Sequence, residues 1–360
     1  MLKQVIPMKE IERLGADAIR ALFQDIPVVA LNSLEIESRV QDKRVDLLAS
    51  VEVAGKHHIL VCETKQSGQP RFVRDAIYQL RDYLREFPNE ATPVVIAPFL
   101  SPGSRKLCLE NGVSFLDLEG NVRLAFGTVF IDRVRANKPS PELRELKSLF
   151  KPKSAQVLRV LFRDPKKSWK VVDLANAASV SLGHASNVRT ALLNREWGAL
   201  DAEGLHLRSP EELLDAWKSA YMPPVAERLP FYTTLHGSLL ENRVKKFFNS
   251  SPKDFRVALA SFSAAQWIAP YGRTSTLFLW SEKMAIEDIK EKLQLSSSLK
   301  GENVVVSIPQ DNAVFFDAYA PEHDICCTSP LQTYLDLSKD GERGEEAAEH
   351  LRRMRLTWQT

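Results

Sequence analysis

An acid and a lysine end an apolar run early in the chain, in the stretch "ILVCETKQSGQP" at residues 59–70. Successive side chains of a strand point to opposite faces, so Glu63 and Lys65 would lie side by side on one face. A second acid, Asp46, stands in the preceding apolar run, "RVDLLASVEV". The connection "AGK" between the runs predicts a hairpin, which would bring Asp46 and Glu63 to one edge with Lys65 beside them.

This combination suits metal-dependent attack on a phosphodiester. Two carboxylates, Asp46 and Glu63, are hard oxygen ligands that can hold Mg²⁺ together with waters and a phosphate oxygen. The metal would lower the pKa of a bound water, and Lys65 would orient that water or neutralise the phosphate. Gln79, one helical turn beyond Asp75 on the following predicted helix, could point into the same site.

An acid-x-Lys triplet alone is weak support, because the chain contains four: Glu63/Lys65, Glu145/Lys147, Asp164/Lys166 and Asp288/Lys290. Only the first ends an apolar strand and has a second acid on the strand before it. The alternative is that Glu63 and Lys65 form a solvated ion pair while Asp46 caps a strand.

The surrounding pattern predicts an α/β sandwich around a mixed sheet. The expected order is helix 9–24, strands 44–53 and 56–65, helix 71–87, strand 92–100, helix 102–112 and strands within 113–134.

Asp46, Glu63-x-Lys65 and Gln79 in "AIYQLRDYL" together resemble the PD-(D/E)XK nuclease superfamily, which has a restriction-endonuclease-like core. The resemblance implies that the two acids bind the metal and that the lysine assists catalysis. It also implies an acid on the first helix, for which the candidates are Glu10, Glu12 and Asp17. Val45 stands where the superfamily usually has proline.

The chain of 360 residues is long enough for two or three domains, with 44% hydrophobic and 26% charged residues and a net charge of +2. Proline-rich, charged seams at 135–154 and 221–230 predict domains at 1–138, 139–222 and 223–360. Neither a leader-like start nor a membrane-length apolar run is present, and the four cysteines lack CxxC spacing. We therefore expect a cytoplasmic protein in a reducing compartment, without structural zinc or a membrane partner.

The middle domain concentrates positive charge. Residues 143–195 hold 11 Lys or Arg and three acids, a local net of +8, which favours binding to a polyanion. Three predicted helices, at 154–165, 170–179 and 182–196, and a two-stranded wing around Glu203-Gly204 indicate a winged helix-turn-helix. The alternative is a protein-interaction module or a linker domain.

In this predicted winged helix-turn-helix domain, we assign contacts with the DNA bases and contacts with the phosphates to different residues. Asn and Arg side chains can make bidentate contacts to base edges. The third helix should direct outward five such polar residues: His184, Ser186, Asn187, Arg189 and Thr190. Lys166, Lys167 and Lys170 should hold phosphates of double-stranded DNA.

The last domain is predicted to be α+β, with strands at 303–309 and 312–319 and two C-terminal helices. Its runs "FSAAQWIAPY" and "SPLQTYLDL…GERGEEAAEHLR", together with "VSFLDLEGNVRL" nearer the N-terminus, resemble the AbiEi family of antitoxin-type transcriptional regulators from type IV toxin-antitoxin systems. The resemblance implies an operator-binding winged helix, an antitoxin role for the C-terminal domain, and a nucleotidyltransferase toxin as functional partner.

Three functions are compatible with these patterns. The leading one is a DNA-binding regulator of antitoxin type whose nuclease-like domain clamps DNA or forms a homodimer. The second is a Mg²⁺-dependent DNA endonuclease targeted by its winged helix. The third is a scaffold that binds only a partner toxin.

Overall fold

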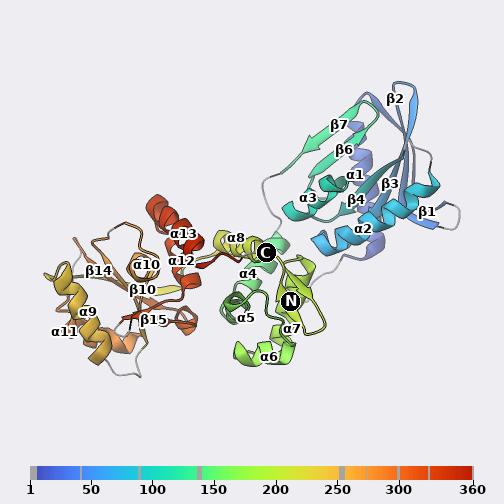
Figure 1. The fold of residues 1–360 in the computed structure, drawn as a ribbon. Helices are drawn as coiled ribbons and strands as arrows, with labels where there is room; N and C mark the ends of the chain where they lie inside the picture. The colour runs from blue at the N-terminus through green and yellow to red at the C-terminus, as the bar shows by residue number, and fades with distance from the viewer. Residues whose placement is uncertain are drawn as a thin grey trace. The chain divides into compact units, whose positions relative to one another are not determined.

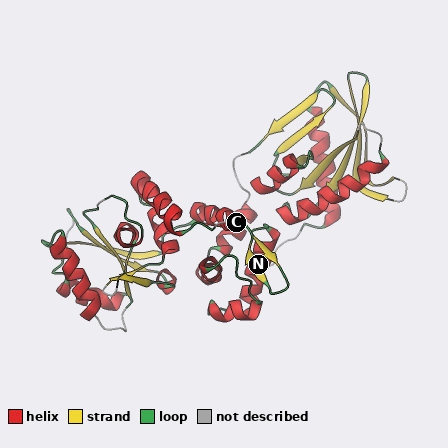
Figure 2. Cartoon of the chain, viewed as in Figure 1, coloured by secondary structure: helices red, strands yellow, loops and turns green. Residues whose placement is uncertain are grey.

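The computed structural model describes residues 6–40, 43–87, 91–135, 140–250, 256–272, 274–297, 301–322 and 325–358. The chain divides into two compact units, one of residues 1–145 with 190–196 and one of residues 146–189 with 197–360. Both mix helices and strands (Figures 1 and 2). The mixed α/β class expected from the sequence is confirmed, while the domain boundaries stay predictions.

The N-terminal unit is built on a seven-stranded mixed sheet in the order β1-β2-β3-β4-β5-β6-β7. β3 runs parallel to β4 and β4 parallel to β5, while the remaining neighbours are antiparallel. The strands are β1 (Val29–Val40), β2 (Lys43–Val53), β3 (Lys56–Thr64), β4 (Ala91–Ala97), β5 (Ser114–Asp117), β6 (Val122–Phe126) and β7 (Val129–Arg133).

Helices cover both faces of this sheet, because its strands carry apolar side chains on both faces (Figure 2). α1 (Met8–Gln24) packs on one face through Ile19, Leu22 and Phe23. On the other face lie α2 (Pro70–Tyr83), continued by the short 3-10 helix η1 (Leu84–Glu86), and α3 (Pro102–Glu110). Glu63, two residues after Val61 on β3, and α2 belong to this second face.

The hairpin predicted from "AGK" is present between β2 and β3. Ala54 and Gly55 at its tip have φ of 51° and 79°, the left-handed values that a two-residue hairpin turn requires. The sequence prediction omitted β1, whose residues "VALNSLEIESRV" alternate poorly between apolar and polar. β1 is an edge strand, where half of the backbone groups and much of one face remain free of sheet neighbours.

The second unit begins with helices α5 (Pro152–Arg163), α6 (Val171–Ala177) and α7 (Leu182–Asn194), of which α7 is grouped with the N-terminal unit from Thr190 onward. α4 (Ser140–Leu149) precedes them. β8 (Gly198–Leu200) and β9 (Leu205–Leu207) then form a two-stranded antiparallel sheet. At its turn, a Cβ on Gly204 would lie 2.2 Å from the Trp169 carbonyl oxygen, so only glycine fits.

A second mixed sheet of seven strands has the order β13-β10-β14-β12-β11-β16-β15. Its strands are β10 (Val225–Tyr232), β11 (Val257–Leu259), β12 (Leu277–Ser281), β13 (Ser296–Ser297), β14 (Val304–Pro309), β15 (Tyr319–Glu322) and β16 (Ile325–Cys327). The helices that follow β9 in this unit are α8 (Pro210–Ala220), α9 (Ser238–Ser250), α10 (Ser261–Ile268), α11 (Ile286–Lys292), α12 (Pro330–Leu337) and α13 (Gly341–Arg355), with the 3-10 helix η2 (Lys283–Ala285).

The predicted strand at 303–309 corresponds to β14, whereas the prediction of a strand over 312–319 is wrong. Residues Asn312–Phe315 form the 3-10 helix η3, and β15 starts only at Tyr319. The Asp311 side chain accepts a hydrogen bond of 2.8 Å from the Ala313 amide, which turns the backbone before a strand can form. Among the described residues, no helix has the length and apolar character needed to cross a bilayer.

The loop that follows β3 depends on close backbone packing at Gly68. A Cβ at this position would lie 1.9 Å from the Phe99 carbonyl oxygen, and Gly68 itself accepts a 2.6 Å hydrogen bond from Ser104 Oγ. We predict that Gly68→Ala lowers the free energy of unfolding by about 1–3 kcal/mol, because the backbone must shift to relieve the overlap. Urea unfolding would measure the change.

Gly103 provides the matched control. An added Cβ there has no neighbour closer than 3.8 Å, so Gly103→Ala should change stability by less than about 0.5 kcal/mol or raise it slightly. Equal effects of the two substitutions would contradict the packing account.

Candidate functional site

The β2–β3 hairpin brings together the residues that the sequence singled out in the first domain. The β2–β3 ladder ends at the pair Leu47–Cys62, so Asp46 and Glu63 are the next residue of each strand beyond it. Lys65 Nζ lies 2.7 Å from Glu63 Oε1 and 2.5 Å from Gln79 Oε1 of α2. All four predicted residues therefore gather at the carboxyl end of β3.

Asp46 is held by the backbone and side chain of Thr64, a residue that the sequence did not single out. Asp46 Oδ2 accepts 2.8 Å hydrogen bonds from both the Thr64 amide and the Thr64 hydroxyl. These bonds occupy one carboxylate oxygen and fix the orientation of the group. No motif marks this threonine, because its role follows only from the pairing of the two strands.

Glu63 is a buried carboxylate with one oxygen left without a partner. Its side chain is 4% exposed, and Oε2 has no hydrogen-bond partner. Burial and then the nearby Asp46 raise the pKa of Glu63 to about 7, although Lys65 and Tyr83 act to lower it. A buried, unpaired acceptor is costly, so this oxygen is suited to a ligand that the protein itself does not supply.

The structure distinguishes between the three acids expected on the first helix. Glu10 and Asp17 are exposed and form ion pairs with Arg13 at 2.7 and 3.1 Å. Glu12 is 6% exposed, and burial followed by the charge of Asp46 raises its pKa. Among the three, Glu12 is therefore the buried acid that senses the charge of Asp46.

The carboxylates at this site can be judged as ligands for a divalent cation by their number and type. Across the part of the chain that is described, no group of three or more His, Cys, Asp or Glu side chains converges as metal ligands. Asp46 and Glu63 nevertheless supply two hard carboxylates, and the unpartnered Glu63 Oε2 is a free ligand atom. Such a pair fits Mg²⁺, which usually keeps several waters and takes only one or two protein carboxylates.

The residues predicted to contact DNA lie on α7 and on the connection between α5 and α6. Lys166 and Lys167 are exposed in that connection, and Lys170 is exposed at the start of α6. On α7, Asn187 and Thr190 are exposed and Ser186 is half-buried. The Lys167 ammonium lies 4.1 Å from the centre of the Trp169 ring, an interaction that orients the lysine.

The side chains of two α7 residues are less exposed to solvent than the sequence predicted. A ring nitrogen of His184 lies 3.1 Å from the Ser154 hydroxyl of α5, so this histidine joins two helices. Arg189 is half-buried, and its Nε has no hydrogen-bond partner. The helical spacing places both residues near the boundary between the inner and outer faces, and a sequence pattern does not resolve that boundary.

The burial of Glu63 has a consequence for stability that depends on pH. Because its pKa rises from 4.5 to about 7 in the folded protein, the folded state holds a proton that the unfolded state has released. The contribution of this proton to the stability of the folded protein is complete below pH 4.5 and is lost as the pH rises through 7. Without added metal, the advantage of Glu63→Gln over the wild type should therefore grow by up to about 3 kcal/mol across this window. Urea unfolding at several pH values would measure it.

Glu10→Gln is the control, because this exposed residue has a lowered pKa and should give no such increase. A constant difference between wild type and Glu63→Gln over the whole window would contradict the buried, partly protonated state.

Comparisons with solved structures find low similarity over limited parts of the chain. A repair endonuclease from Pyrococcus abyssi is 18% identical over 28% of this chain and 45% of its own, with a TM-score of 0.22. The EndoMS–double-stranded DNA complex is 18% identical over 28% of this chain and 42% of its own, with a TM-score of 0.21. An XisH family protein from Nostoc punctiforme is 18% identical over 30% of this chain and 91% of its own, with a TM-score of 0.22. This chain thus spans under half the length of the first two proteins, and similarities of this size carry no functional conclusion.

No curated protein matches the chain. A family model does match, over residues 206–356, and it is described as "Transcriptional regulator, AbiEi antitoxin, Type IV TA system". Two of the three motifs that resembled this family, "FSAAQWIAPY" and "SPLQTYLDL…GERGEEAAEHLR", lie inside the matched residues, and "VSFLDLEGNVRL" lies outside them. Residues 206–356 therefore match the AbiEi antitoxin family model, as the C-terminal motifs predicted.

Proposed function

We propose that the protein is a DNA-binding transcriptional regulator of antitoxin type, with a nuclease-like N-terminal domain that clamps DNA or dimerises. The family match over residues 206–356 is the observation that carries this proposal, because that family is described as transcriptional regulators. The DNA reader would be a winged helix-turn-helix made of α5, α6 and α7 with β8 and β9 as its wing.

The chemistry of the exposed residues supports this assignment. Asn187 presents an amide that can bond the edge of adenine, and Lys166, Lys167 and Lys170 present ammonium groups suited to phosphates. Electrostatic attraction from this basic segment would give non-specific affinity, and α7 would supply sequence preference. The expected partners are double-stranded DNA, a nucleotidyltransferase toxin acting as functional partner, and a second copy of the chain.

A substitution series would separate base reading from phosphate contact. Asn187→Ala should weaken binding to the preferred promoter site by about 1–3 kcal/mol and leave binding to unrelated DNA nearly unchanged. Lys167→Ala should weaken binding to all sequences alike and reduce the salt dependence by about one phosphate contact. Fluorescence anisotropy with promoter and unrelated duplexes at several salt concentrations would measure both.

Lys283→Ala is the matched control, because this lysine of the C-terminal unit is 82% exposed and lies far along the chain from the proposed reader. If Asn187→Ala and Lys283→Ala bound the promoter equally, or if the wild type showed no preference for it, the regulator proposal should be abandoned. Capture of a toxin by a chain without DNA affinity would instead favour a scaffold that binds only the toxin.

A second function, a Mg²⁺-dependent DNA endonuclease targeted by the same winged helix, is favoured by one observation. Glu63 Oε2 is buried without a partner, in a side chain that lies next to Lys65, and the adjacent Thr64 binds Asp46. Bound Mg²⁺ would activate a water and stabilise the charge that develops on the phosphate. Asp46 and Glu63 would hold the ion, Lys65 would orient the attacking water once released from Glu63, and Gln79 would position Lys65.

This second function predicts strand cleavage with Mg²⁺ or Mn²⁺ that is lost in both Asp46→Asn and Lys65→Ala. Plasmid nicking and cleavage of linear and branched duplexes would measure it, with Glu10→Gln as a control that keeps the site intact. Absence of cleavage by the wild type on every substrate with either metal would exclude the endonuclease. Calorimetric binding of Mn²⁺ to wild type and not to Asp46→Asn would show whether the pair holds a metal without cleaving.

A further inference from the structure

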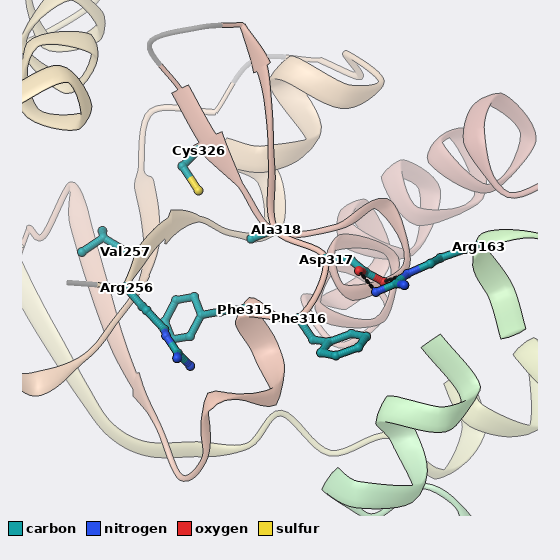
Figure 3. A pocket seen from close by; sticks show the side chains of 8 residues that line it. All are labelled: Arg163, Arg256, Val257, Phe315, Phe316, Asp317, Ala318 and Cys326. Atoms are coloured by element: carbon teal, nitrogen blue, oxygen red, sulfur yellow. Dashed lines mark hydrogen bonds and ion pairs between the residues drawn. The ribbon is translucent and has the colours of Figure 1, made fainter. Parts of the chain in front are cut away.

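A cavity of about 610 Å³ in the second unit lies where α5 meets the β15 and α12 segments. Its charged lining consists of Arg159, Arg163, Arg355 and Asp317. An adjoining cavity of about 500 Å³ shares Arg163, Asp317 and Ala318 with it. Figure 3 shows this second cavity, with the Arg163 guanidinium turned toward Asp317 and with Arg256 and Phe315 on the far side of Phe316.

Arg159 is the unusual member of this lining. It is 5% exposed, yet Nε and Nη1 have no hydrogen-bond partner. Nη2 donates a 2.5 Å bond to the neutral Gln332 Oε1, and the guanidinium lies 5.4 Å from the centre of the Trp217 ring. Several N–H donors of a buried cation are thus left without acceptors, which is costly in an apolar surrounding.

The nearest buried acid does not remove this deficit. Asp336 reaches Arg159 only through Gln332, whose Nε2 donates to Asp336 Oδ1 over 2.8 Å. The carboxylate also accepts hydrogen bonds from Tyr221 and Trp280 at 2.6 and 2.9 Å. The acceptors that the protein places around Arg159 are therefore already engaged elsewhere.

The other charged groups of the cavity leave a positive excess. Arg163 is paired with Asp317, with Nε 2.9 Å from Oδ2. Arg355 donates its Nε–H to the Ile268 carbonyl oxygen over 2.9 Å, and this neutral acceptor does not balance its charge. Three guanidinium groups thus line a cavity that contains one carboxylate, and Ser329 at the start of α12 adds a hydroxyl.

The remaining lining is apolar or aromatic, with Phe162, Tyr319, Leu331 and Leu356. A volume of this size is typical of sites for small organic molecules. Guanidinium groups match the planar oxygen pairs of phosphate, and several can share one dianion. A duplex cannot reach a side chain as buried as Arg159, which separates this cavity from the proposed DNA surface.

We propose that this cavity is a binding site for a small phosphate monoester with an apolar or aromatic body, whose phosphate is held by Arg159, Arg163 and Arg355. Arg159 and Arg163 are both on α5, so the ligand would bridge this helix to the C-terminal sheet region. An effect on DNA affinity would follow if α5 belongs to the DNA reader, and only that consequence rests on the proposed function.

Isothermal titration calorimetry of the full chain with phenyl phosphate tests the site directly, with inorganic phosphate and phenol as comparison ligands. Phenyl phosphate should bind more tightly than either fragment and raise the melting temperature. Arg159→Met, which keeps the apolar stem, should weaken binding about tenfold or more, since it removes charged hydrogen bonds. Asp317→Asn should tighten binding, because it removes the competing acid.

Arg256→Met is the matched control, since Arg256 lines only the adjoining cavity and should leave the affinity unchanged. Arg159→Met should also raise the melting temperature of the ligand-free protein, because a buried charge with incomplete partners is removed. No heat with phenyl phosphate, equal affinities of Arg159→Met and Arg256→Met, or no gain over inorganic phosphate would each overturn the proposal. Calorimetric binding in a protein without DNA affinity would refute the regulator proposal and leave this one standing.

Discussion

The pairing of β2 with β3 is the constraint on which the N-terminal site depends. The hairpin turn at Ala54-Gly55 sets the register, and the register brings Asp46 to the end of β3, where Thr64 binds it beside Glu63. Helix α2 then covers that face and supplies Gln79, which keeps Lys65 beside Glu63. A slip of the β2–β3 register by one residue would move Asp46 away from Thr64 and destroy the arrangement, so fold and site are determined by the same backbone hydrogen bonds.

Burial raises the pKa values of Glu63 and Glu12, whereas exposed acids would stay ionised at neutral pH. The neighbouring Asp46 and the loss of solvent keep Glu63 partly protonated near neutral pH, and the pKa of Glu12 moves in the same direction. An acidic cluster of this kind is stable only when a proton or a cation is present. In the second unit, Arg159 presents the opposite case, a buried cation whose donors exceed the acceptors around it.

The sequence was most informative where local chemistry decides the structure. Period-two apolar runs and a turn glycine predicted the β2–β3 hairpin, and the convergence of Asp46, Glu63, Lys65 and Gln79 followed from it. Contacts between distant segments could not be predicted this way: Thr64 supporting Asp46, Glu12 standing apart from Glu10 and Asp17, and Arg159 reaching Gln332 across 173 residues. The strand predicted at 312–319 failed because one side-chain bond from Asp311 outweighed the β propensity of the apolar residues.

As an antitoxin-type regulator, the protein is proposed to bind operator DNA. The most direct measurement is a footprint on end-labelled promoter DNA of its own gene, with and without Mn²⁺, read for both protection and strand breaks. We expect a protected site that persists without metal, that needs about tenfold or more protein in Asn187→Ala, and that shows no breaks. Unprotected DNA, or metal-dependent breaks in place of protection, would contradict this proposal.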